Sequence, residues 1–223
     1  MIAPSEDTSR RLREVYPGLS VTVIPHGSRP VGARTPAQRA VRQPDEPVKF
    51  GFIENLTQHK GIEILTSAFA RAVRISPCEL HIWGAVNNSY KTICNKPHVY
   101  YHGPYSSETL GEITQLIDIG VIPSIVPETF CYTLSELSSA GLPCLVADLG
   151  SLGERVIHDV NGWKVTPGDV TAWEAALVRL ASDPRLLETI HSSVAVRSLE
   201  AMCGDYARIY AGVCAPRESS LEA

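Results

Sequence analysis

Six short apolar runs recur between residues 48 and 165, and segments with helical spacing separate most of them. The runs cover residues 48–53, 79–83, 99–101, 119–125, 143–147 and 163–165. Within residues 60–74, for example, Ile62, Leu65, Phe69 and Val73 fall on one helical face. Apolar strands that alternate with amphipathic helices are typical of a parallel sheet covered on both faces. The alternation therefore predicts an α/β fold with a Rossmann-like parallel sheet and helices on both of its faces.

The flanking segments predict further elements and divide the chain. Ser5 is a candidate cap for a helix over residues 5–19, and a strand over 21–24 follows. Residues 28–46 are polar and rich in proline, which indicates a linker. Other helices are predicted over 106–117 (capped by Ser106 or Ser107), 131–140, 152–158, 170–182 (capped by Asp169), from 183 onward, and over 204–213. The predicted parts are an N-terminal segment 1–27, a linker 28–46, a domain 47–203, and a C-terminal helix and tail 204–223.

Composition excludes several classes of protein. The chain has 223 residues, 44% of them hydrophobic, and a formal net charge of −4. These values fit one soluble domain with appendages and give no basic face for a nucleic acid. The chain has neither a run near the ~20 apolar residues of a membrane span nor the apolar core of a signal peptide. The six cysteines lack zinc spacing, so we expect reduced thiols in a cytoplasmic protein without an integral membrane segment. Peripheral association with the inner membrane face stays open.

Residues that follow the apolar runs are expected to meet at one edge of the sheet. The carboxyl ends of parallel strands share an edge, and ligands of such sheets bind beyond it. Residues 51–55, Gly84, Gly103 and Glu128 all follow or end a predicted strand. The two glycines would let a flat ligand approach, although ordinary turns explain them almost as well. Tyr105 would either border that ligand or pack on the surface.

Two carboxylates flank the start of one predicted helix. Glu128 lies in the loop after the run 119–125, and Glu136 lies about two helical turns later. The free N–H groups and the positive dipole end of that helix form an anion site between them. A nucleotide-sugar suits this arrangement, with the diphosphate on the amides and the ribose and sugar hydroxyls on the carboxylates. Such a glutamate pair also occurs by chance on solvated helices, so the spacing alone is weak.

Lys60 is the candidate cation of the same edge. It stands with Gly61 at the start of the helix 60–74, after the loop 54–59. A lysine at a helix start is disfavoured by the helix dipole unless it reaches an anion. An exposed loop lysine is an equally good interpretation of the residue alone.

The segment from Pro127 to Gly150 resembles the nucleotide-sugar motif of retaining GT-B glycosyltransferases of group 1. It reads Pro-Glu-Thr-Phe, then Leu-Ser-Glu, then Ala-Gly-Leu-Pro, an apolar strand and Asp-Leu-Gly. A looser match extends over most of residues 47–185. The resemblance implies the C-terminal, donor-binding half of a GT-B architecture. Residues 1–27 would then be the end of an N-terminal, acceptor-side domain, and residues 28–46 the hinge.

The resemblance also implies roles for individual residues. Glu128 would hold the donor sugar near its anomeric centre, Lys60 would clamp the diphosphate, and Glu136 would bind the ribose. The remaining donor contacts would come from the backbone of Phe130 and Cys131 to the sugar, and from Thr133 and Leu134 to the phosphate. The segment 148–155 also matches the family, in a structural or pocket-lining role.

Three positions depart from the family pattern. The arginine that partners the lysine is assigned to Phe52, so half of the cationic clamp is missing; Asn55, Gln58 or His59 could replace it. Thr129 stands where the family has proline, and Cys131 where it has glycine. A Cβ at a place where backbone approaches a ligand narrows the pocket, which bears on the choice of sugar more than on nucleotide binding.

The sequence thus supports two hypotheses. In the first, the chain is the donor-binding domain of a retaining hexosyltransferase that uses a nucleotide-diphosphate sugar and needs no metal or other cofactor. Because most of the acceptor domain is missing, the chain alone would turn over poorly. In the second, it is a non-catalytic nucleotide-sugar binding module, or one that a second polypeptide completes. A relative of nucleotide-sugar epimerases is a weaker third option.

Overall fold

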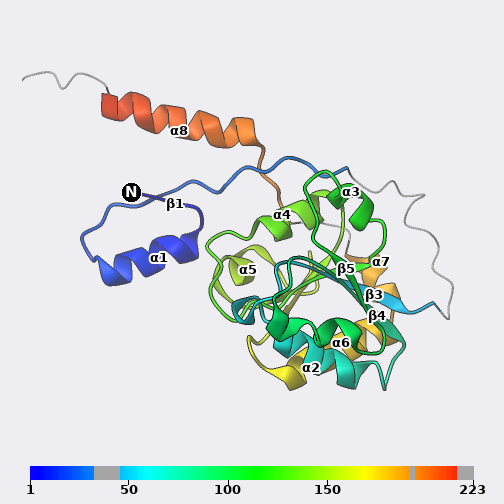
Figure 1. Ribbon diagram of the computed structural model, residues 1–223. Coiled ribbons are helices and arrows are strands. Elements are labelled where there is room, and N and C mark those ends of the chain that lie inside the picture. Colours follow the sequence, from blue (N-terminus) through cyan, green and yellow to red (C-terminus); the bar gives the residue numbers. More distant parts are fainter. Residues whose placement is uncertain (33–45, 191–193, 215–223) are drawn as a thin grey trace, which may run out of the picture.

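The computed structural model describes residues 1–32, 46–190 and 194–214, and a six-stranded sheet forms its centre (Figure 1). The strands follow the order β5-β4-β3-β6-β7-β8, and every neighbouring pair is parallel. Their bounds are β3 Val48–Ile53, β4 Cys78–Trp83, β5 Val99–Gly103, β6 Ile119–Ile122, β7 Cys144–Ala147 and β8 Trp163–Val165. The predicted Rossmann-like parallel sheet is confirmed. Most of the predicted linker and the C-terminal tail lie outside the described residues.

Helices cover both faces of the sheet, each around its own apolar cluster (Figure 1). The helices on one face are α2 (Ile62–Ala72), α6 (Val170–Ser182) and α7 (Arg185–Thr189), and those on the other are α3 (Leu110–Ile113), α4 (Tyr132–Ser139) and α5 (Gly150–Arg155). Along β3, Phe50 and Phe52 belong to the first cluster and Ile53 to the second, because successive side chains of a strand point to opposite faces. The predicted two-sided burial is therefore confirmed.

The order of the sheet reverses between β3 and β6. From β3 the chain builds outward to β4 and β5, then crosses to the other side of β3 and builds outward again. Phe50 pairs with Ile119 and Gly51 with Gly120, so the carboxyl ends of β3 and β6 lie side by side. A crevice at such a reversal is where ligands of open α/β sheets bind. The loops after these two strands therefore define the candidate site.

Several elements differ from their predicted bounds. The run 119–125 ends as a strand at Ile122, because Pro123 has no N–H for the ladder. The helix predicted over 106–117 reduces to α3, and neither Ser106 nor Ser107 caps it; the Ser106 N–H donates to Thr109 Oγ1 instead, at 3.1 Å. The helix predicted over 152–158 is α5, which ends at Arg155.

Other elements were not predicted, or begin earlier than predicted. These are β1 (Ile2–Ala3), three short 3-10 helices at Gln58–Lys60, Asn88–Tyr90 and Ile93–Asn95, and α8 (Leu199–Cys214), of which only 204–213 was predicted. The predicted caps at Ser5 and Asp169 are confirmed, since each side chain accepts a hydrogen bond from the first turn of its helix.

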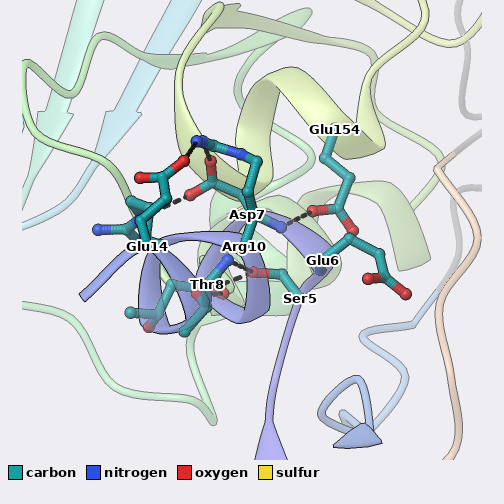
Figure 2. Close-up of polar contacts among 9 residues, drawn as sticks. Ser5, Glu6, Asp7, Thr8, Arg10, Glu14 and Glu154 are labelled. Atoms are coloured by element: carbon teal, nitrogen blue, oxygen red, sulfur yellow. Dashed lines mark hydrogen bonds and ion pairs between the residues drawn. The ribbon is translucent and has the colours of Figure 1, made fainter. Parts of the chain in front are cut away.

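The N-terminal residues form a small unit of their own. β1 pairs in parallel with β2 (Thr22–Val23), and α1 (Glu6–Val15) connects the two strands. Glu154 of α5 fastens this unit to the domain: its carboxylate accepts the backbone N–H groups of Glu6 at 3.2 Å and Asp7 at 2.9 Å (Figure 2). A carboxylate at the start of a helix satisfies free N–H groups and complements the helix dipole.

Helix α8 lies apart from the sheet domain, at the other end of the picture from α2 and α6 (Figure 1). None of its described residues is buried, and Met202 Sδ accepts a hydrogen bond from the Gly27 N–H at 3.2 Å. Within the described ranges, no helix combines the length and the apolar character needed to cross a bilayer.

A histidine pair occupies the outer strands of the sheet. His81 Nδ1 on β4 lies 3.0 Å from His102 Nε2 on β5, and the second ring nitrogen of His81 lies 3.1 Å from the Glu79 carboxylate. Trp83 stacks on His102 with the ring centroids 4.3 Å apart. One proton bridges the two rings, so they cannot both be charged without losing that bond. Burial, and the charge of His81, lower the pKa of His102 below its ordinary value of 6.5.

We expect acidification to destabilise the protein through this pair. Below about pH 6.5 the unfolded chain binds a proton at residue 102 more readily than the folded chain does, so the free energy of unfolding falls as pH falls. The measurement is urea unfolding between pH 7.5 and pH 5.5. Over this range the free energy of unfolding should fall less in His102→Gln than in wild type. His98→Asn serves as the control: His98 is exposed, as His102 is, and asparagine tolerates its positive φ. Equal pH slopes for wild type and His102→Gln would contradict the expectation.

Candidate functional site

Three charged side chains converge where the loops after β3 and β6 meet. Lys60 Nζ lies 3.1 Å from a carboxylate oxygen of Glu54 and 2.9 Å from one of Glu128. The three side chains are only 20%, 13% and 17% exposed. A lysine placed between two largely buried carboxylates at the reversal of the sheet is the centre of the candidate site.

The backbone around Gly61 fixes the position of Lys60. Gly61 has a φ of 74°, and a Cβ on it would lie 1.9 Å from the carbonyl oxygen of Pro123. The Ile125 N–H donates to the His59 carbonyl at 3.0 Å in the same place. Only glycine allows this close approach at this φ, so Gly61 lets the two loops join and turns Lys60 toward Glu128.

Glu128 is held from both sides. Ser124 Oγ donates to the same carboxylate oxygen that pairs with Lys60, at 2.7 Å. The backbone carbonyl of Glu128 accepts a hydrogen bond from the Ser151 N–H at 3.0 Å. Gly150 lies so close that a Cβ on it would come within 2.8 Å of the same carbonyl oxygen. Glu128 therefore has a fixed backbone and an oriented carboxylate.

Glu54 belongs to the site, although sequence reasoning gave it no role. Its second carboxylate oxygen accepts a hydrogen bond from Thr133 Oγ1 at 2.9 Å, so Glu54 links Lys60 to the first turn of α4. Gly84, with a φ of 149°, packs against its backbone, where a Cβ would lie 2.0 Å from the Glu54 carbonyl oxygen. The signal in the sequence was its place: an acidic residue directly after a buried strand.

The charge of Glu54 influences the groups around it. Burial by itself would lower the pKa of Lys60, but Glu54 and then Glu128 outweigh it and raise that pKa. Burial, followed by Glu54, raises the pKa of Glu136 and raises that of Tyr105 to about 12. Lys60 therefore stays protonated, while the crevice around it is rich in negative charge.

Arg155 supports the loop that leads into α4. Its guanidinium donates to the carbonyl oxygens of Phe130 at 2.7 Å and Cys131 at 3.2 Å, and to Ser135 Oγ at 2.7 Å. It also lies 4.3 Å from the centroid of the Phe130 ring. Burial lowers the pKa of Arg155. Arg155 thus holds the loop before α4 in place. For the segment 148–155, only a structural or pocket-lining role was predicted.

Cys131 adopts the backbone conformation that glycine favours. Its φ is 63°, it precedes the first residue of α4, and its side chain is buried in the apolar cluster with Leu134. Burial, followed by Glu54, raises the pKa of its thiol to about 12. The glycine of the family pattern would carry no strain here, whereas a residue with a Cβ does.

The other predicted site residues lie around this centre. Asn55 Oδ1 accepts the Ala85 N–H at 3.1 Å, and the Tyr105 hydroxyl donates to the Ile53 carbonyl at 3.3 Å. Leu134 is fully buried, so only its backbone can face a ligand. Gly103 has a φ of 89° and open space around its Cα.

Phe52, the position assigned to the missing arginine, contributes no side chain to the site. Phe52 is fully buried in the cluster beneath α2 and α6, so a side chain at this position points into the core and not into the crevice. Glu54 and Asn55 are the first residues beyond β3 whose side chains leave the core.

An open cavity of about 470 Å³ adjoins the site on the side of the N-terminal unit. It lies between α1 and α5, and its lining includes Arg10 of α1, Glu154 of α5 and Asp148 of the loop before α5. Gly150 belongs to its wall and also touches the backbone of Glu128. Among the residues that the structure describes, no cluster of three His, Cys, Asp or Glu could hold a metal ion.

Comparisons with known sequences agree with the geometry. A profile described as glycosyl transferases group 1 matches residues 47–183. An uncharacterized glycosyltransferase of Methanocaldococcus jannaschii is 30% identical over 144 residues, which is 61% of this chain and 37% of that protein. Glycogen synthase of Mycobacterium tuberculosis is 29% identical over 194 residues, 82% of this chain and 46% of that protein. The chain thus spans less than half the length of these curated relatives.

Solved structures share the fold. Sucrose-phosphate synthase from Thermosynechococcus elongatus superposes with a TM-score of 0.78 at 22% identity, covering 95% of this chain and 57% of that one. HepE from Anabaena, solved in complex with UDP and glucose, gives a TM-score of 0.77 at 19% identity, covering 95% and 62%. At such identities the likeness concerns the fold alone, and it confirms the predicted GT-B relationship.

We expect Arg155 to be the main support of the loop before α4. Arg155→Met removes three hydrogen bonds of a partly buried cation and leaves their acceptors without that donor, so the free energy of unfolding should fall by about 2–3 kcal/mol. Chemical denaturation measures the loss. Arg179→Met is the control, since the Arg179 ion pair with Asp159 is nearly half exposed and its loss should cost less than about 1 kcal/mol. Similar losses in the two variants would count against this role.

Proposed function

The chain belongs to the group 1 glycosyltransferases, and on that premise we propose that it is the donor-binding part of an enzyme that transfers a hexose, with retention, from a nucleotide-diphosphate sugar. The observation that carries the proposal is the position of Lys60 beside Glu128, at the reversal of the sheet and next to the start of α4. A cation, a fixed carboxylate and a helix N-terminus in one crevice are the groups that a sugar diphosphate requires.

The proposed reaction breaks the bond between the anomeric carbon and the diphosphate. Negative charge develops on the departing diphosphate, where Lys60 and the backbone N–H groups of Thr133 and Leu134 would stabilise it. Glu128 would bind the sugar near the anomeric carbon, with the backbone of Phe130 on its hydroxyls. Glu136 would take the ribose. None of these steps requires a metal, and the proposed reaction uses none.

The acceptor is expected on the side of the N-terminal unit. The cavity between α1 and α5 reaches Gly150, which touches the Glu128 backbone, so a molecule in this cavity would approach the sugar position. We propose that an N-terminal acceptor domain or a second polypeptide supplies the remaining acceptor contacts. Residues 1–27 would be the end of such a domain.

A second candidate function has one observation in its favour. Lys60 is already paired with two carboxylates, which weakens its attraction for a phosphate. The chain would then be a nucleotide-sugar binding module that does not itself catalyse transfer, or that does so only with a partner. Donor binding is common to both candidates, whereas turnover in the presence of an acceptor separates them.

Calorimetric titration of the purified chain tests the proposal. The panel contains UDP-, GDP- and ADP-sugars and the free diphosphates, without added metal. UDP-glucose comes first, because the Anabaena neighbour was solved with UDP and glucose. Binding of one nucleotide class would identify the donor. A folded sample that binds none of them, even at millimolar concentration, would refute donor binding by this chain.

Variants locate the site within that experiment. Lys60→Ala and Glu136→Ala should each weaken binding of the nucleotide-sugar by about tenfold or more, because each removes a charged hydrogen-bonding group. Lys96→Ala and Glu108→Ala are controls that change the same charges at exposed positions. Far-ultraviolet circular dichroism confirms that each variant is folded. Unchanged affinity in both site variants would show that the nucleotide-sugar does not bind beside Lys60 and Glu136.

A further inference from the structure

We propose that Glu54 occupies the place of a donor phosphate, so that its carboxylate must swing away before a diphosphate can bind. The inference rests on the proposed function, because it concerns the same crevice. It makes Glu54 the residue that sets the affinity of the chain for the diphosphate group, in addition to the residues that contact the donor.

The contacts of Glu54 are those expected of a bound anion. One carboxylate oxygen lies 3.1 Å from Lys60 Nζ, and the other accepts a hydrogen bond from Thr133 Oγ1 at 2.9 Å. Lys60 and the first turn of α4 are the cation and the helix start that make this crevice an anion site. The side chain is only 13% exposed, so it lies between the loop after β3 and the start of α4 and does not extend into solvent.

A diphosphate and the Glu54 carboxylate compete for the same charge. Lys60 pairs with Glu54 and Glu128 together, and Glu136 lies near enough for Glu54 to raise its pKa. A diphosphate placed at Lys60 with Glu54 still present would add like charges at close range in a poorly hydrated crevice. Binding therefore requires that Glu54 give up its contact with Lys60.

The backbone of Glu54 is fixed, so the displacement is a side-chain rotation. The Glu54 N–H donates to the Trp83 carbonyl at 3.0 Å, and Gly84 packs directly against the Glu54 carbonyl. Rotation of the side chain would leave Lys60 paired with Glu128 and free one side of its ammonium group. Thr133 Oγ1 and the start of α4 would become available at the same time.

The test compares wild type with Glu54→Gln, using UDP and uridine as the probes in calorimetric titrations. Glutamine keeps the size of the side chain and an oxygen that can accept the Thr133 hydrogen bond, but it lacks the charge. We expect Glu54→Gln to bind UDP about tenfold more tightly than wild type and to bind uridine as wild type does, because uridine carries no phosphate. Glu108→Gln, which removes a charge from an exposed position, should leave both affinities unchanged.

Each outcome decides between the inference and the function on which it rests. If UDP binds wild type and Glu54→Gln equally, or binds the variant more weakly, the inference is overturned and the donor site stands. If neither protein binds UDP, GDP or ADP, the proposed function fails and the inference with it; if only GDP or ADP binds, that diphosphate and its nucleoside replace UDP and uridine in the comparison. If UDP and uridine both bind the variant more tightly, the effect does not come from the phosphate position, and the inference is also overturned. Thermal melts establish folding, and Glu54→Ala, which removes the same charge without glutamine's hydrogen bond, repeats the UDP titration should Glu54→Gln not fold.

Discussion

The pairing of β3 with β6 is the constraint on which the candidate site depends. It brings the loop that contains Lys60 against the loop that contains Glu128, although the two residues are far apart in the sequence. Gly61 then allows contact between the loops, because no other residue could occupy its position against Pro123. The ion pair is therefore a consequence of the sheet topology, and the buried strands fix its geometry more firmly than the charges themselves do.

The balance of charge determines what this geometry can do. A cation beside a helix start attracts phosphate strongly only while its charge is unopposed. Here two carboxylates face Lys60, and the crevice also contains Glu136, whose pKa is raised by burial and by Glu54. The same carboxylates that neutralise Lys60 would therefore compete with a phosphate placed beside it. On the inference above, the affinity of such a preformed site would depend on the rotation of one side chain, Glu54.

The sequence allowed the fold and the neighbourhood of the site to be predicted, but not its contacts. Apolar periodicity was sufficient for the sheet, since six strands with both faces buried leave few alternatives. The resemblance pointed to Lys60 and Glu128. It assigned Lys60 to the diphosphate and Glu128 to the donor sugar, and it did not predict that the two side chains pair with each other. The absence of a cation at Phe52 agrees with its place in β3, where alternation sends its side chain into the core. Glu54 was missed because its two contacts, with Lys60 and with Thr133, form only when the loop after β3 packs against the start of α4.

Helix α5 shows how the two sides of the crevice are connected. Glu154 accepts the first N–H groups of α1 (Figure 2), whereas the next residue, Arg155, holds the loop before α4. At its other end, the Ser151 N–H binds the carbonyl of Glu128. Because packed elements shift as rigid bodies and do not deform freely, a displacement of this short helix would move all three of its contacts together. The placement of α1, on the proposed acceptor side, is therefore mechanically linked to the carboxylate proposed to hold the donor sugar.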